Sequence, residues 1–140
     1  EQRGLIAASA DQGAGIQWAV TGYQGTGVPD GTATELGTGS ANTDNIIAQN
    51  GAGTTYAAGL CRAYKGGGYT DWYLPSKDEL YKLYINRVAI GGFFSSSTSD
   101  SYWQSTEASW TNAYYLYFPT GAWGGSTKAD GRRVRAVRAF

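Results

Sequence analysis

The segment 71–80, with the sequence DWYLPSKDEL, constrains the fold more than any other part of the chain. Residues 72–74 are aromatic and apolar and predict a short strand. Ser76 then stands three residues before Glu79, which is the spacing of a capping box, where each side chain accepts a hydrogen bond from the other residue's backbone N–H. The apolar residues that follow recur at i, i+3 and i+4, as on one face of an amphipathic helix. The sequence therefore predicts a helix that starts at Ser76 and ends before Gly91-Gly92.

Strand patterns lie near both ends of the chain, with helical patterns between them. The expected strands are residues 4–9, 16–20, 102–106, 113–118 and 133–140. Two further helices are expected. One begins at Ser40 or Asn42, and the other begins at Thr54 or Thr55 and stops before the glycines 66–68.

The remaining segments are expected to be turns and loops. Residues 11–13 form a turn signal, residues 21–40 predict a long loop, and short loops are expected around Trp110 and Trp123. Strands at both ends with helices between them indicate an α+β fold, in which the terminal strands are candidates for pairing. A length of 140 residues is typical of one domain, so the whole chain is interpreted as a single unit.

The chain has no histidine and one cysteine, Cys61. This composition excludes Ser-His-Asp and Cys-His catalytic systems, histidine metal sites and a structural zinc site. Cys61 lies in an apolar run and is expected to be a buried thiol. A hydrolase that uses two carboxylates, such as Asp71 and Glu107, is an alternative, but nothing in the sequence supplies the pKa shift it needs. Calcium could bind carboxylates and carbonyls, but no EF-hand-like spacing occurs. We therefore expect no enzymatic activity and no cofactor, and the sequence identifies no metal site.

Charge and hydropathy restrict the partners. The 11 basic residues balance the 11 acidic residues, which argues against nucleic acid and anionic membranes as partners. No apolar run approaches the roughly 18 residues that a membrane-spanning helix needs, so no membrane insertion is expected. The sequence opens at Glu1 without methionine, from which we expect a piece of a longer protein or a mature form.

The last third of the sequence gathers aromatic rings among small polar residues. Such mixtures are typical of recognition surfaces, and flat rings suit the apolar faces of sugars. Alternation along residues 113–118 places Tyr115 and Tyr117 on one face of a strand, whereas Trp72 and Trp103, each in an expected strand, are assigned to the core. The candidate ligand-binding residues are Trp110, Asn112, Tyr115, Tyr117, Trp123, Asp130 and Arg132.

The arginines near the C-terminus are given different roles. Arg135 and Arg138 fall on opposite faces of the last expected strand, and we expect each to pair with a carboxylate such as Glu79 or Glu107. Arg132 is the one expected to remain available to a ligand.

Three segments in order, 71–80, 102–107 and 134–140, resemble the C-terminal domain family of Legionella collagen-like protein. The marks of that family are a D-W-x-L-P-S/T-x-x-E-L box, a Y-W-S-S-T box and a terminal V-R-x-V-R, and residues 4–8 fit its opening strand. Gln104 departs from the second box, where the family has a serine. At a surface strand Gln104 could still form a hydrogen bond, but no role of that serine is carried over to it.

The resemblance implies a fold similar to the C-type lectin-like fold, with paired terminal strands. It also implies an extracellular or cell-surface bacterial module, or one on a phage particle, that ends a longer collagen-like protein. Related domains bind glycans in adhesion, some are homotrimers, and some are targets of diversity-generating retroelements, with which residues 108–133 are compatible. The expected function is non-catalytic display of a surface that binds a glycan or protein ligand. The alternative is a structural or oligomerisation cap of a fibrous protein.

Overall fold

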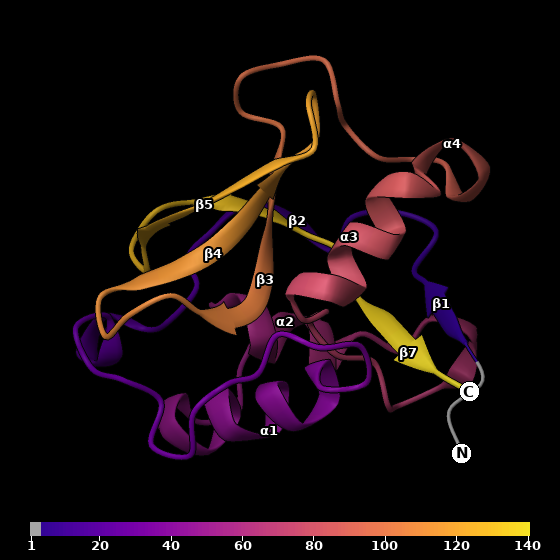
Figure 1. Cartoon of the computed structure of the whole chain (residues 1–140). Helices are drawn as coiled ribbons and strands as arrows, with labels where there is room; N and C mark the ends of the chain where they lie inside the picture. Colours follow the sequence, from indigo (N-terminus) through magenta and orange to yellow (C-terminus); the bar gives the residue numbers. More distant parts are fainter. Residues whose placement is uncertain (1–3) are drawn as a thin grey trace.

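The computed structural model describes residues 4–140, in which two β-sheets are packed with helices (Figure 1). A small sheet pairs β1 (Leu5–Ala7) with β7 (Val137–Ala139) in antiparallel orientation. A larger sheet has the order β2-β6-β3-β4-β5, and only its β3–β6 pairing is parallel. Its strands are β2 (Gly13–Ile16), β3 (Ser101–Glu107), β4 (Asn112–Tyr117), β5 (Ala122–Thr127) and β6 (Arg132–Val134). The α+β class and the pairing of the terminal strands are confirmed.

The helices occupy the middle of the chain, as expected. They are α1 (Gly39–Asn50), α2 (Ala57–Ala63), α3 (Lys77–Ile85) and α4 (Arg87–Ile90), with short 3₁₀ turns η1 (Thr21–Tyr23) and η2 (Gly66–Gly68). The capping box is present: the Ser76 side chain accepts a hydrogen bond from the Glu79 N–H, and Glu79 Oε1 accepts one of 2.9 Å from the Ser76 N–H. The helical region after Ser76 ends before Gly91, although it is divided between α3 and α4.

Two expected strands near the helices are wrong. In residues 16–20 only Ile16 belongs to a strand, and Gln17 forms an isolated bridge to Tyr56. Trp18 and Ala19 are both fully buried and do not alternate between core and solvent. The pairing instead uses the residues just before, including part of the expected turn. Residues 72–74 form only a single bridge, from Tyr73 to Val137. The N–H of Leu74 donates to a threonine side chain of α1 rather than to a strand partner.

The C-terminal third also differs from expectation in two places. Residues 122–127 were expected to be a loop but form β5, which pairs with β4 at every position. The expected strand 133–140 is interrupted at Arg135 and Ala136, so that β6 joins the large sheet and β7 joins the small one. One segment therefore connects the two sheets.

Two groups of buried apolar residues lie on opposite sides of the large sheet. Successive residues of β3 point to opposite faces of the sheet, so Trp103 belongs to one group and Tyr102 to the other. Trp72 is buried in the first group, as expected, and so is Cys61. Phe118 is buried in the second.

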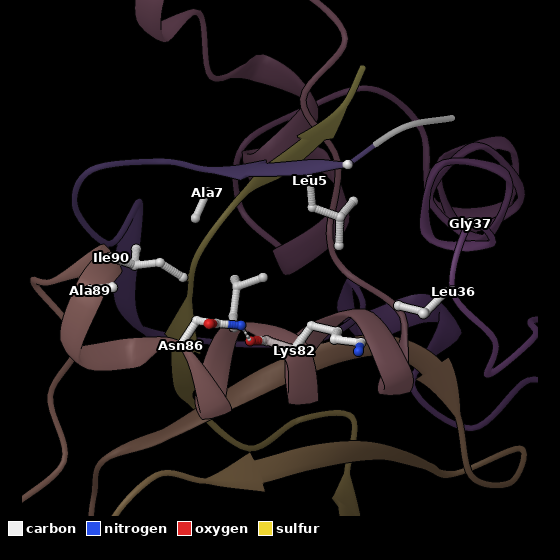
Figure 2. Close-up of a pocket in the computed structure, with 10 residues that line it drawn as sticks. Leu5, Ala7, Leu36, Gly37, Lys82, Asn86, Ala89 and Ile90 are labelled. Carbon is white, nitrogen blue, oxygen red and sulfur yellow. Dashed lines mark hydrogen bonds between the residues drawn. The ribbon is translucent and has the colours of Figure 1, made fainter. Parts of the chain in front are cut away.

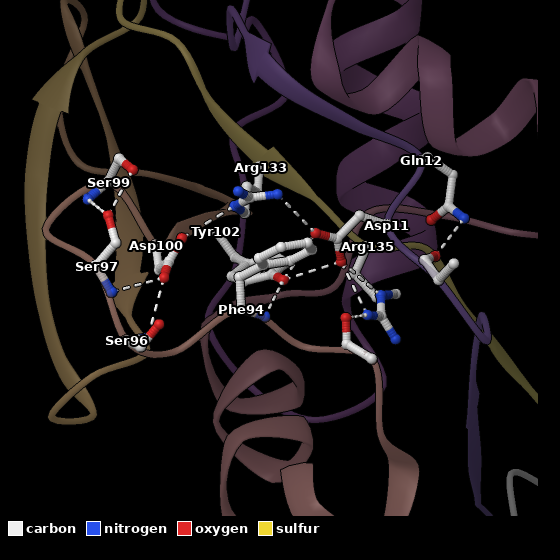
Figure 3. Close-up of polar contacts among 12 residues, drawn as sticks. Asp11, Gln12, Phe94, Ser96, Ser97, Ser99, Asp100, Tyr102, Arg133 and Arg135 are labelled. Carbon is white, nitrogen blue, oxygen red and sulfur yellow. Dashed lines mark hydrogen bonds and ion pairs between the residues drawn. The ribbon is translucent and has the colours of Figure 1, made fainter.

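Buried ion pairs tie the two ends of the described chain together (Figure 3). Arg135 is fully buried, and its Nε donates a hydrogen bond of 2.9 Å to Asp11 Oδ1. The hydroxyl of Tyr102 donates to the same carboxylate at 2.9 Å, and Arg133 lies between Asp11 and Asp100. Buried charges are stable only when they are paired, so this network fixes how the termini meet.

Arg135 and Arg138 pair with carboxylates other than Glu79 and Glu107, the two that the sequence suggested. Arg138 donates to Asp71 Oδ1 at 2.7 Å, and this hydrogen bond lowers the pKa of Asp71. Glu79 is occupied in the capping box, and Glu107 pairs with a buried lysine in the β5–β6 connection. Pairing of Arg135 and Arg138 with carboxylates is confirmed, whereas the partners suggested for them are wrong.

Candidate ligand-binding site

The register of the β4–β5 hairpin places the candidate residues on two faces. Tyr115 lies opposite Gly124 and Tyr117 lies opposite Ala122, so these side chains share one face of the sheet. Trp123 is opposite Leu116 and therefore points to the other face. The expectation of a single aromatic surface is not met by this arrangement.

The Arg132 face is the side of the hairpin that presents Tyr115 and Tyr117. The guanidinium carbon of Arg132 lies 3.8 Å from the centroid of the Tyr115 ring. Its Nε and Nη1 donate to the hydroxyls of Ser126 and Ser101 at 3.0 and 2.6 Å. Partial burial lowers the pKa of Arg132. Within residues 4–140 Arg132 forms no ion pair, and the charge of nearby Asp130 only partly offsets the effect of burial on its pKa.

Other candidates lie at the end of the hairpin far from its tight turn. Trp110 is 74% exposed on the β3–β4 loop, and its ring packs against Gly27, where a Cβ atom would lie 2.7 Å from the ring. Asn112 begins β4 and is half-buried. Asp130 is exposed in the turn after β5, where its N–H donates to Thr127. These three residues lie apart from Trp123.

The Trp123 face is the opposite side of the hairpin, next to the start of α3. Trp123 is 54% exposed, and its ring meets that of Tyr114 edge-on at 5.4 Å. The ammonium group of Lys77 lies 3.4 Å from the centroid of the Trp123 ring. A cation at this distance from an indole is attracted to its π-electrons, which holds the exposed ring in place.

A pocket of about 350 Å³ opens beside Trp123, between α3 and the strands β3 to β5. Its lining residues are Lys77, Asp78, Tyr81, Gln104, Leu116, Gly121 and Trp123. Of these only Trp123 was a candidate from the sequence. Lys77 and Asp78 resemble ordinary first-turn residues of a helix, and Gln104 was expected at a surface strand. Gln104 is instead 1% exposed, because α3 covers this part of β3.

A second, larger pocket lies away from the hairpin. It measures about 780 Å³ and runs between β1 and the helices α3 and α4 (Figure 2). Leu5, Leu36, Leu83 and Ile90 give it a largely apolar lining, and Leu36 is half-exposed at its rim. None of the candidate residues lines this pocket.

These elements define a small α+β domain whose aromatic hairpin projects from a frame held by buried ion pairs. The chain belongs to the family of Lcl C-terminal domains, whose model matches residues 8–138. Comparison with curated proteins gives no match. The family confirms the resemblance based on the three sequence boxes and indicates a domain of a surface protein.

Residues 4–140 contain neither a candidate membrane-spanning helix nor a cluster of metal-ligating side chains. No helix among them combines the length and the apolar character needed to cross a membrane. In the same residues, no three His, Cys, Asp or Glu side chains gather as a set of metal ligands.

Proposed function

We propose that this chain is a non-catalytic ligand-binding domain, displayed on the surface of a bacterium or of a phage particle. Its ligand is a glycan or a protein, and the β4–β5 hairpin with its flanking residues binds it. The observation that supports this most is the exposure of Trp123. A tryptophan that is half in water forgoes much of the free energy of burial, and such exposure is typical of binding surfaces.

The frame behind Trp123 is suited to recognition because it is already ordered. The N–H of Lys77 donates to the Thr106 hydroxyl at 3.0 Å, and the N–H of Ser105 donates to the Pro75 carbonyl at 2.7 Å. These bonds join the start of α3 to β3. A ligand that meets a preformed surface loses less free energy to ordering the protein, so rigidity favours affinity.

Absence of catalysis is part of the proposal. The two carboxylates considered for hydrolysis are each engaged in an ion pair, Asp71 with Arg138 and Glu107 with Lys128. The hydrogen bond from Arg138 lowers the pKa of Asp71, which makes this carboxyl unsuitable as a general acid at neutral pH. Binding without turnover fits the residues better.

A glycan array and a protein array test the proposed function with the wild-type domain, Tyr117→Ala and Trp123→Ala. Wild type should bind at least one ligand. Because Tyr117 and Trp123 lie on opposite faces of the hairpin, at least one of the two variants should lose about tenfold or more in affinity for it, with its stability changed by no more than about 1 kcal/mol. Tyr69→Ala is the matched control, since this ring is 49% exposed and stacks on Arg138 far from the hairpin. Wild-type binding to neither array overturns the proposal, as does equal binding by all variants.

The second candidate function is a cap that holds copies of a fibrous protein together as a homotrimer. The largely apolar pocket beside β1, with the half-exposed Leu36, supports it because an oligomer interface would cover such a surface. Light scattering over a range of concentrations distinguishes the two: a trimer at all concentrations favours the cap, and a monomer contradicts it.

The proposal extends to variation of the hairpin between isolates. If the domain is a target of a diversity-generating retroelement, residues 108–133 should vary while residues 71–80 and 134–140 stay constant. Sequencing the gene in sibling isolates checks this, and an invariant 108–133 region contradicts it.

A further inference from the structure

We infer that the pocket beside Trp123 binds a sugar residue, and that the buried side-chain amide of Gln104 is its polar anchor. This inference rests on the proposed ligand-binding function and specifies a neutral, hydroxyl-bearing ring as the ligand of this part of the surface. The pocket lies on the Trp123 face, between the first turn of α3 and strands β3 to β5.

Gln104 has an unusual environment for a buried polar residue. Its backbone carbonyl accepts a hydrogen bond of 2.7 Å from the Trp18 indole, which fixes the strand at this position. Its side chain is 1% exposed, and Oε1 has no hydrogen-bond partner among the described residues. Buried amides are normally paired, since an unpaired one loses its hydration without compensation. A ligand hydroxyl that entered the pocket could donate to this oxygen.

The charges around the pocket favour a neutral ligand. Lys77 and Asp78 both line it, and neither forms an ion pair within residues 4–140. Because one is a cation and the other an anion, a singly charged ligand would be attracted by one and repelled by the other. A hydroxyl group can accept from an ammonium and donate to a carboxylate, so a polyol can satisfy both and Gln104 as well.

The size and apolar surfaces of the pocket fit a sugar ring. Its volume of about 350 Å³ lies near the lower end of ligand pockets, which suits a small ligand. Leu116 and the part of the Trp123 ring that the Lys77 ammonium leaves uncovered supply apolar surface for the C–H groups of a sugar, and Tyr81 is 48% exposed at the same site. Few buried polar groups beside aromatic surface are the usual composition of such sites.

Nuclear magnetic resonance of the isotope-labelled domain tests this inference with the methyl glycosides of glucose, galactose, mannose and N-acetylglucosamine. At least one should shift the Gln104 side-chain NH₂ signals and the Trp123 indole N–H signal together, in a saturable manner. Gln104→Met, which keeps the length of the side chain but not its amide, should weaken that binding about tenfold or more. Gln49→Met is the control, because Gln49 lies on α1 and should leave sugar binding unchanged.

The outcomes separate this inference from the proposed function. If no glycoside shifts the two signals, or if Gln104→Met binds as the wild type does, the sugar pocket is wrong. The proposed function still stands in that case if the wild type binds an array ligand and Trp123→Ala does not. Should Gln104→Met fail to fold, Gln104→Ser replaces it, with the same expected loss. A protein ligand that shifts both signals where sugars do not also overturns the inference.

Discussion

Arg135 and Asp11 are 124 positions apart in sequence, and the Nε of Arg135 donates a 2.9 Å hydrogen bond to the Asp11 carboxylate. Both side chains are withdrawn from water, with relative exposures of 0% and 9%. The contact anchors the segment after β1 to the connection between β6 and β7, and thus helps to hold the two sheets in their arrangement.

Removing one member of this pair should strongly destabilise the folded domain. Asp11→Ala leaves the Arg135 charge buried without its carboxylate, and we expect the free energy of unfolding to fall by about 3–5 kcal/mol. Asp71→Ala is the control, since its pair with Arg138 is as short but Asp71 is 58% exposed, and a loss below about 1 kcal/mol is expected there. Urea unfolding measures both. Equal losses would contradict the role given to burial.

The start of α3 should depend more on Glu79 than on Ser76. Glu79 is fully buried, and its carboxylate accepts hydrogen bonds from the N–H groups of Ser76 and Gly37 and from the Tyr73 hydroxyl. Glu79→Ala leaves these donors unpaired and should cost about 3 kcal/mol or more, whereas Ser76→Ala removes one cap and should cost about 1 kcal/mol. Denaturant unfolding gives both values, and the reverse order would contradict this account.

Alkaline pH should destabilise the fold. Burial raises the pKa of Tyr56 from 10.0 to about 12 and also raises the pKa values of Tyr73 and Tyr102. Above pH 10 the unfolded chain loses these phenolic protons while the folded chain keeps them, so the free energy of unfolding falls as pH rises. The stability is fully present below about pH 9 and is lost from there toward about pH 12. A urea midpoint at about pH 11 that equals the one at about pH 8 would contradict this.

Cys61 should be inert in the folded domain. The thiol is completely buried, and burial raises its pKa, so the reactive thiolate is disfavoured. Alkylation by iodoacetamide at about pH 8 should be at least about 100-fold slower in the native protein than in urea. Since there is one cysteine, the mass of the product reports this site alone. Comparable rates in the two states would show that the thiol is accessible.

Local signals in the sequence predicted local structure well. The spacing of Ser76 and Glu79 predicts a capping box from the sequence alone, because its hydrogen bonds close within four residues. The pairing of the terminal strands followed from their apolar patterns and from the family resemblance. Trp72 and Trp103 are in the core, as their position in apolar segments predicted.

Features that depend on distant contacts could not be predicted in the same way. The two glycines of β5 are typical of a loop sequence. In the structure, however, the Tyr115 side chain packs over Gly124, and a Cβ atom there would lie 3.0 Å from the Tyr115 hydroxyl oxygen. The carboxylate partner of Arg135 is at the other end of the chain. Burial of Gln104 depends on where α3 packs, and the face that Trp123 occupies depends on the register of the hairpin. These relationships exist only once the fold has formed.

Fluorine-19 NMR of the domain labelled with 5-fluorotryptophan tests most directly whether the aromatic hairpin binds the ligand. The ligand is one identified on the arrays. Trp110→Phe and Trp123→Phe assign the signals of the two exposed tryptophans. On addition of ligand the Trp123 signal should shift saturably, while the signals of the buried Trp18, Trp72 and Trp103 stay in place. A ligand that binds without moving either exposed tryptophan signal would contradict recognition through the aromatic hairpin.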